Sequence, residues 1–243
     1  DWSWSRGLGD VYKRQELGGH APFIVFEDAD LDEAVIGAMA NKYRNSGQVC
    51  VSANRIYVHE SIYDEFSNRL AEKSSQLKVA DGRTEGSQIG PLITPQAFKK
   101  VEEHVEDAVE KGAKILTGGT SDNSGVQFYK PTVLTDINNN MKIYYEETFG
   151  PVAPIIKFKD ENEVIEMAND TKYGLAGYFY SRDIGKIWRV AEALEYGMVG
   201  INAGVISTEV APFGGIKESG IGREGAEEGI EEYLEIKLSL IHI

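Results

Sequence analysis

The feature that most constrains the fold is a regular alternation of short apolar strands and amphipathic helices from residue 16 onward. Short apolar runs between glycine, proline or acidic residues predict strands, and apolar residues at helical spacing predict helices. Strands are predicted at 20–26, 54–59, 114–116, 132–134, 152–158, 174–180 and 198–202, and helices at 31–44, 61–76, 95–111, 161–169, 185–194 and 224–233. Strands separated by helices are typical of the α/β class, with a doubly wound, mostly parallel sheet and flanking helices.

Capping residues predict where several helices begin and end. Asp28 or Asp30 offers a side-chain N-cap to the helix at 31–44, and Ser61 offers one to the next helix. Gly112 follows the helix at 95–111, where glycine is favoured because it adopts the left-handed conformation without strain.

Charge and cysteine content limit the partners and the compartment. The formal net charge is -14 and the isoelectric point is near 4.8. Phosphate backbones and anionic membranes repel such a polyanion, so we expect no nucleic-acid partner and no membrane partner. The single cysteine, Cys50, excludes an intrachain disulfide and favours a reducing compartment. We see no apolar run long enough to span a bilayer and no secretory signal, so we expect the cytoplasm, or else an organelle matrix.

The two ends of the chain differ from the rest. Residues 1–15 include Trp2 and Trp4, and they show neither strand nor helix periodicity. We interpret 1–15 as a foreign or disordered segment, such as translated linker sequence. By the same hypothesis, residues 239–243 are foreign as well.

Cys50 is the first candidate for chemistry. It lies in a predicted loop between a helix and a strand. A lone cysteine is often only a small buried apolar residue. Here Gly47 and Gln48 open the backbone just before the thiol, which suits exposed amides that stabilise a thiolate and then an oxyanion. We therefore expect an ionised, accessible nucleophile, with the buried structural role as the alternative.

Two acidic segments accompany this cysteine. Glu16 precedes two glycines at the start of a predicted strand, so it is either a solvated charge or a base that activates water or the thiol. The segment 144–151 places acidic and aromatic residues ahead of Gly-Pro, a turn signal. A carboxylate there could accept hydrogen bonds from ribose hydroxyls, and an aromatic ring could lie against a planar ring. Alternatively, the segment is simply a loop that leads into the next strand.

The remaining motifs argue against a nucleotide loop and against a metal site. The glycine-rich stretch 200–224 is not a dinucleotide fingerprint, because no Gly-x-Gly-x-x-Gly opens a helix behind a first strand. We interpret it as a close-packed loop that lines the substrate site, or as a structural loop. The four histidines are scattered and a lone cysteine cannot form a thiolate cluster, so we expect no bound metal.

Taken together, the motifs resemble the aldehyde dehydrogenase superfamily over residues 16 to about 237. Glu16-Leu-Gly-Gly is similar to the family's catalytic glutamate motif, and Gly47-Gln-Val-Cys50 is similar to its nucleophile motif. The segment 146–151 resembles the one that contacts the nicotinamide riboside, and segments 169–176 and 212–220 resemble structural signatures. The resemblance implies an aldehyde dehydrogenase catalytic domain that uses NAD or NADP. Cys50 and Glu16 would be catalytic, Glu147 would hold the ribose, and Phe149 would pack near the nicotinamide.

Three further segments, 195–202, 206–212 and 222–225, most resemble succinate-semialdehyde dehydrogenases. In that subfamily an arginine six residues before the nucleophile and a serine of an Ile-Ser segment hold the distal carboxylate of the substrate. The resemblance implies that Arg44 and Ser207 have this role here. A guanidinium can hold a carboxylate through two hydrogen bonds, and a hydroxyl donates a third. The alternative for Arg44 is a cation at a helix C-terminus, favoured by the helix dipole.

The implied reaction is oxidation of a small aldehyde, succinate semialdehyde, to succinate. A Cys50 thiolate attacks the carbonyl, the thiohemiacetal passes hydride to the nicotinamide, and Glu16 activates the water that hydrolyses the thioester. One alternative is a dehydrogenase for another aldehyde, such as glutarate semialdehyde. The other is a catalytically silent relative that keeps only the fold.

The resemblance also implies a division of the chain. Residues 16–222 would form the catalytic domain, and 223–243 a C-terminal helix with a truncated oligomerisation strand. Family members have a long region before the glutamate motif, which carries most of the cofactor-binding domain. We therefore expect this chain alone to be inactive, and its full-length parent to be a homo-oligomer. Ser52 stands where some relatives carry a second cysteine, so their regulatory disulfide is not expected here.

Overall fold

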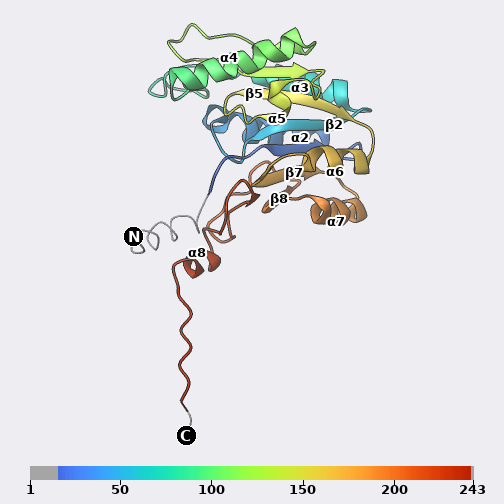
Figure 1. The fold of residues 1–243 in the computed structure, drawn as a ribbon. Coiled ribbons are helices and arrows are strands. Elements are labelled where there is room, and N and C mark those ends of the chain that lie inside the picture. The colour runs from blue at the N-terminus through green and yellow to red at the C-terminus, as the bar shows by residue number, and fades with distance from the viewer. Residues whose placement is uncertain (1–15, 242–243) are drawn as a thin grey trace.

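A seven-stranded sheet forms the centre of the protein (Figure 1). The computed structural model describes residues 16–241, so the segment 1–15 that we interpret as foreign, with Trp2 and Trp4, lies outside the described residues. The strand order is β3-β4-β5-β2-β1-β7-β8, and every neighbouring pair is parallel except β3 and β4. The strands are β1 (Ala21–Val25), β2 (Ala53–His59), β3 (Lys114–Thr117), β4 (Thr132–Thr135), β5 (Val152–Phe158), β7 (Ala176–Tyr180) and β8 (Met198–Ile201). The predicted α/β class with a mostly parallel sheet is confirmed.

Helices cover both faces of this sheet. One apolar cluster joins the sheet to α2 (Leu31–Tyr43) and α3 (Tyr63–Ser75). The other joins it to α4 (Pro95–Glu110), α5 (Lys142–Tyr145), α6 (Glu161–Asn169) and α7 (Ile184–Ala193). Alternate residues of each strand point to opposite faces, so a strand buried on both sides contributes to both clusters. Among the described residues, every helix is too short or too polar to cross a bilayer.

The predicted helix boundaries are correct where a local hydrogen bond sets them. The Asp30 side chain accepts a hydrogen bond from the Glu33 amide and caps α2. Gly112 follows α4 with a φ of +104°, as expected of a residue that ends a helix. Ser61 is not an N-cap, because its hydroxyl lies 2.8 Å from His59 Nδ1 and is engaged there. Helix α3 therefore begins at Tyr63 without a side-chain cap.

The strand predicted at 174–180 is two strands. Gly174 belongs to β6 (Tyr173–Gly174), which pairs with β9 (Ile216–Lys217) in a separate antiparallel ribbon, and β7 begins only at Ala176. The Gly174 amide donates to Ser219 Oγ (2.9 Å) and so is directed away from the main sheet, whereas its carbonyl accepts from the Gly197 amide just before β8. Sequence pattern alone does not reveal this break, because both strands are apolar and contiguous.

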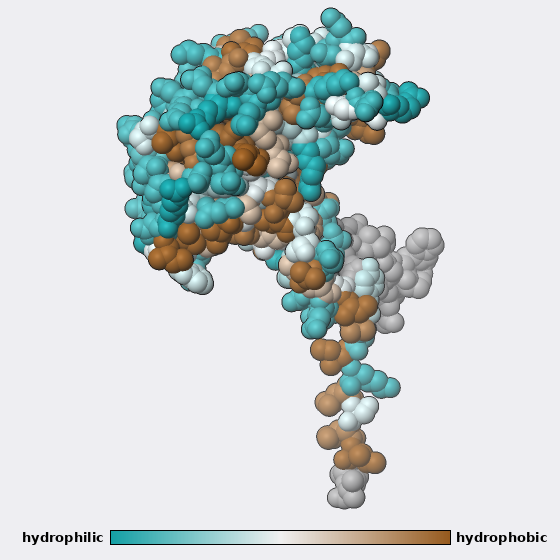
Figure 2. Space-filling model, turned by 180° about the vertical axis from the view of Figure 1, so that it is seen from behind, coloured by the Kyte–Doolittle hydropathy of each residue, from teal (hydrophilic) through white to brown (hydrophobic). Residues whose placement is uncertain are grey.

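The C-terminal helix is much shorter than predicted. Helix α8 spans only Glu228–Glu231, because Gly225 and Ala226 have φ of +74° and +48° and no residue of the helix is buried. Residues 232–241 form no strand, and they leave the sheet as an extended tail (Figure 1). Apolar and polar side chains alternate along this tail (Figure 2), with Leu234, Ile236, Leu238 and Leu240 all exposed.

Candidate active site

The candidate site lies where the chain enters three neighbouring parallel strands. Glu16 precedes β1, Cys50 precedes β2 and Glu147 precedes β5, and these strands are adjacent in the order β5-β2-β1. Parallel strands begin at the same edge of a sheet, so the three loops meet at the amino edge. Open α/β sheets more often bind ligands beyond the carboxyl ends of their strands. Within residues 16–241, no three histidine, cysteine or acidic side chains gather as metal ligands.

The loop that carries Cys50 is backbone-strained and held by neighbouring residues. Asn45, Ser46 and Gly47 have positive φ of 50°, 58° and 73° in the turn that follows α2. A non-glycine residue in this conformation costs on the order of 1–3 kcal/mol and persists only where surrounding contacts enforce it. One such contact is with Gly90, whose amide donates to Ser46 Oγ (2.9 Å) and whose carbonyl accepts from the same hydroxyl (3.1 Å).

Two glycines allow these loops to pack closely. A Cβ at Gly19 would lie 2.2 Å from the Cys50 carbonyl oxygen. A Cβ at Gly47 would lie 2.1 Å from the carbonyl oxygen of Gly150. Both distances are far below van der Waals contact, so any other residue would push the loops apart. The glycines beside the glutamate and the cysteine in the sequence motifs therefore have a structural reason.

Cys50 is half-buried, and its surroundings disfavour the thiolate. The pKa of the thiol is raised to about 12, first by burial and then by a hydrogen bond to the Glu16 carboxylate and by its charge. The charge of Glu147 acts in the same direction, while the backbone amide of Cys50 lowers the pKa. The expectation of an ionised thiol stabilised by the open backbone at Gly47 and Gln48 is therefore wrong, because burial and two carboxylates outweigh one amide. Glu16 does lie beside the thiol.

Replacing Glu16 by glutamine is expected to accelerate alkylation of Cys50 between pH 7 and 9. The thiol pKa lies above the value of about 8.5 for a free cysteine, so little thiolate is present in this range. Removing the neighbouring negative charge lowers that pKa, and each unit gives about tenfold more thiolate. The rate of iodoacetamide reaction against pH measures the effect, with Glu60→Gln at the opposite end of β2 as the control. Slower alkylation in Glu16→Gln would show that the carboxylate instead promotes ionisation.

The Glu147 side chain lies against Gly18 and Gly19. Its Oε1 accepts a hydrogen bond from the Gly19 amide (3.0 Å). A Cβ at Gly18 would lie 2.9 Å from Oε2, so glycine leaves this oxygen room for a ligand. Burial raises the pKa of the Glu147 carboxyl. Phe149 is half-buried with a φ of +54°, a conformation that a bulky residue adopts only under constraint.

A buried histidine that sequence analysis did not single out contacts the residues on both sides of Glu147. His104, on α4, has Nδ1 3.1 Å from Thr148 Oγ1 and Nε2 3.3 Å from a carboxylate oxygen of Glu146. Burial is the main reason that the pKa of His104 is lowered, so the ring is neutral near pH 7. Because a carboxylate only accepts, Nε2 carries the proton and Nδ1 accepts from the Thr148 hydroxyl. Helix α4 therefore supports the segment that presents Glu147.

Arg44 and Ser207 line one small pocket, which we call the Arg44 pocket. Val49 and Val51, the neighbours of Cys50, also line it. The structure thus places the exposed guanidinium and the exposed hydroxyl together, beside the loop that carries the thiol. The remaining lining residues are Asn41, Tyr178, Gly204, Val205 and Ile206.

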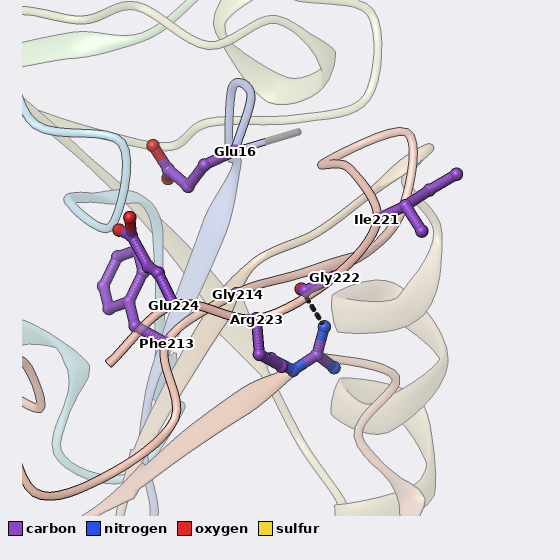
Figure 3. A pocket seen from close by; sticks show the side chains of 7 residues that line it. All are labelled: Glu16, Phe213, Gly214, Ile221, Gly222, Arg223 and Glu224. Carbon is purple, nitrogen blue, oxygen red and sulfur yellow. Dashed lines mark hydrogen bonds between the residues drawn. The ribbon is translucent and has the colours of Figure 1, made fainter. Parts of the chain in front are cut away.

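A second pocket is bordered by Glu16 (Figure 3). Its other walls come from the glycine-rich stretch, namely Phe213, Gly214, Ile221, Gly222, Arg223 and Glu224. Figure 3 shows the carboxylates of Glu16 and Glu224 on the same side of this pocket. Sequence analysis did not single out Glu224, although an acidic residue among glycines was the available signal. The glycine-rich stretch therefore lines both pockets.

Comparison with known proteins agrees with this geometry. The model of the aldehyde dehydrogenase family matches residues 13–239. The NADP(+) succinate-semialdehyde dehydrogenase of Escherichia coli strain K12 is 59% identical over 226 residues, which are 93% of this chain and 47% of that protein. The glutarate-semialdehyde dehydrogenase of Pseudomonas putida is 60% identical over 228 residues, which are 94% of this chain and 47% of that protein.

Solved structures of aldehyde dehydrogenases are also similar to this chain. A succinate-semialdehyde dehydrogenase from Burkholderia pseudomallei superposes with a TM-score of 0.91 at 57% identity, over 95% of this chain and 48% of that one. A betaine aldehyde dehydrogenase from Staphylococcus aureus in complex with NAD+ has a TM-score of 0.85 at 42% identity, over 90% of this chain and 44% of that one. The chain spans about half the length of the curated relatives that it matches. It belongs to the aldehyde dehydrogenase family.

Proposed function

We propose that this chain supplies the nucleophile and the substrate pocket of a dehydrogenase that oxidises succinate semialdehyde to succinate. The supporting observation is that Arg44 and Ser207 line one pocket beside the loop that carries Cys50, with Glu16 next to the thiol. The reaction is proposed for a protein of the relatives' length, and the 243 residues alone are predicted to be inactive. A cytoplasmic location and homo-oligomeric assembly of that protein remain part of the proposal.

NAD or NADP is the proposed cofactor, and Glu147 and Phe149 are the residues of this chain that would hold it. The geometry of Glu147 fits this role, because Oε1 is occupied by the Gly19 amide while Gly18 leaves room beside Oε2 for a ribose hydroxyl. The half-buried Phe149 can present part of its ring to a planar group. The bound nicotinamide would supply the hydride acceptor.

The side chains of the site divide the other steps between them. Arg44 and Ser207 bind the distal carboxylate and so direct the aldehyde carbonyl towards Cys50. The thiol releases its proton to solvent as the sulfur bonds to the carbonyl carbon and the carbonyl oxygen becomes an alkoxide, so Glu16 stays unprotonated for the later step. After oxidation to a thioester, Glu16 takes a proton from the attacking water. The carbon–sulfur bond then breaks, and succinate leaves.

Replacing Arg44 by alanine is expected to lower kcat/KM for succinate semialdehyde by about 100-fold, because a charge-assisted, two-pronged contact is lost. Butanal has the same chain length without the carboxylate, so its kcat/KM should change by less than about threefold. Steady-state oxidation of both aldehydes by the protein of the relatives' length measures the difference. Arg83→Ala is the control, because Arg83 is exposed and pairs only with Asp81 among the described residues. Equal losses on both aldehydes would contradict the role given to Arg44.

Glutarate semialdehyde is the alternative substrate. The glutarate enzyme of Pseudomonas putida is about as similar to this chain as the succinate enzyme of Escherichia coli. The two aldehydes share the distal carboxylate and differ by one methylene, so the same pocket chemistry serves both. The ratio of kcat/KM for the two aldehydes decides between them. A catalytically silent relative would instead oxidise neither.

A further inference from the structure

We infer that Asn41 is a positioning residue that sets the distance between Cys50 and the Arg44 pocket, and thereby the length of carboxylated aldehyde that the site accepts. This inference rests on the proposed function and deepens it. Asn41 lies on α2 and is 5% exposed. It acts through the two loops that its side chain joins.

The two ends of the Asn41 amide bond to different loops. Oδ1 accepts a hydrogen bond from the Ala53 amide (2.6 Å), three residues after Cys50. Nδ2 donates to the Gly204 carbonyl (2.8 Å), three residues before Ser207. The amide group is planar and rigid, so it fixes the separation of the two backbones. The bond to Ala53 is buried, and the bond to Gly204 is partly buried.

The loop that carries Ser207 runs from one edge of the sheet to the other before it reaches the Asn41 amide. Strand β8 ends at the carboxyl edge of the sheet, whereas Cys50 lies at the amino edge. Residues 202–207 therefore run back along α2, and a Cβ at Gly204 would lie 2.3 Å from the Gly37 carbonyl oxygen. Within the described part of the chain, the bond from Asn41 to Gly204 is the only hydrogen bond that residues 203–208 form.

The loop that carries Cys50 does not depend on Asn41 to the same degree. The buried Lys42 donates from Nζ to the Ala53 carbonyl (2.8 Å) and to Asn54 Oδ1 (3.1 Å). The Tyr178 hydroxyl donates to the carbonyl of Val51 (2.9 Å), which holds the loop on its other side. Loss of Asn41 should therefore release the Ser207 loop and leave the thiol in place.

The unequal dependence of the two loops on Asn41 affects which length of substrate the site accepts. The aldehyde carbon must lie at the sulfur while the distal carboxylate lies between Arg44 and Ser207. In a fixed pocket, one methylene more or less changes kcat/KM by about 10- to 200-fold. A pocket whose wall can move discriminates less, because either length can then reach both ends.

The test compares kcat/KM for succinate and glutarate semialdehyde in the protein of the relatives' length. In Asn41→Ala, the ratio of the two kcat/KM values should move towards one by about tenfold or more. Gly204→Ala should do the same, because its Cβ would strike Gly37 while the bond from Asn41 to Ala53 remains. Asn68→Ala, on the exposed face of α3, is the matched control and should leave the ratio unchanged.

Two measurements on the 243-residue chain do not depend on activity. Amide hydrogen exchange in residues 203–208 should accelerate in Asn41→Ala and in Gly204→Ala. Iodoacetamide should modify Cys50 at a rate within about twofold of the parent, because thiolate content is unchanged. The inference would be overturned if the ratio of kcat/KM for the two aldehydes did not change in the variants. It would also be overturned if the unsubstituted protein oxidised both aldehydes equally well, or if amide exchange in residues 203–208 stayed the same. A protein that oxidises no aldehyde would refute the proposed function alone, and the exchange experiment would still test how Asn41 holds the loop.

Discussion

Replacement of Cys50 by serine is expected to reduce aldehyde oxidation by about three orders of magnitude or more, in a protein of the relatives' length. The serine hydroxyl is a far weaker nucleophile near neutral pH, and the covalent route through a thioester is lost. Because the side chain is half-buried and the change is nearly isosteric, the free energy of unfolding should change by less than about 1 kcal/mol. Steady-state production of NADH or NADPH and urea denaturation measure the two quantities.

Ser52→Ala is the matched control for this variant. Ser52 lies two residues after Cys50, is 1% exposed, and its hydroxyl has no hydrogen-bond partner among the described residues. Removing an unsatisfied buried hydroxyl is neutral or stabilising, so Ser52→Ala should retain activity. Substantial activity in Cys50→Ser would remove Cys50 from the mechanism. A loss of activity in Ser52→Ala as well would point to distortion of the loop instead.

Replacement of Arg55 by methionine is expected to lower the free energy of unfolding by about 3–5 kcal/mol. Arg55 is fully buried and forms no ion pair within residues 16–241. Its guanidinium instead donates hydrogen bonds of 2.9–3.2 Å to three backbone carbonyls and two phenol hydroxyls, those of His20, Met167, Ala168, Tyr57 and Tyr196. Methionine fills similar space but removes every one of these donors. The His20 carbonyl then loses both bonds from Arg55, whereas the Met167 and Ala168 carbonyls keep only those from the Tyr57 and Tyr196 hydroxyls. The loss is a large share of the 5–15 kcal/mol typical of a folded protein.

Urea denaturation of the 243-residue chain measures this loss, with Arg69→Met as the matched control. Arg69 lies on α3, where it is partly exposed and pairs with Asp32 and Glu65, so its replacement should cost less than about 0.5 kcal/mol. Arg55→Lys should fall between the two, because lysine keeps the charge but not the forked donors. A loss below about 1 kcal/mol in Arg55→Met would contradict the structural role.

Arg55 also links the buried core to the candidate site through hydrogen bonds. Both its Nε and one Nη bond to the carbonyl of His20, the residue after Gly19. The His20 ring in turn bonds to the carbonyl of Tyr144, near the segment that carries Glu147. Arg55→Met should therefore loosen the site before it unfolds the domain. Faster amide exchange in residues 16–20 and 144–149 is the expected sign.

Secondary structure was predictable wherever local pattern decides it. Strand β5 and helix α6 have the predicted bounds, because an apolar run and an Asp160 N-cap define them locally. The break between β6 and β7 was not predictable, since it depends on a hydrogen bond to Ser219, more than forty residues away. The short α8 also depends on context, because an amphipathic pattern forms a long helix only when its apolar face is covered.

The sequence determined the identity of the reactive groups. Cys50, Glu16, Glu147 and Arg44 stand out through their neighbours along the chain, and the loops entering three parallel strands bring the first three together. Only the tertiary structure decided how those groups behave. The raised pKa of Cys50 depends on carboxylates from two other loops, and the link through Asn41 depends on Gly204, 163 residues away. Both effects act across space between segments that no local pattern relates. Charge and hydrogen bonding depend on distance in the folded chain, whereas sequence motifs record only order along it.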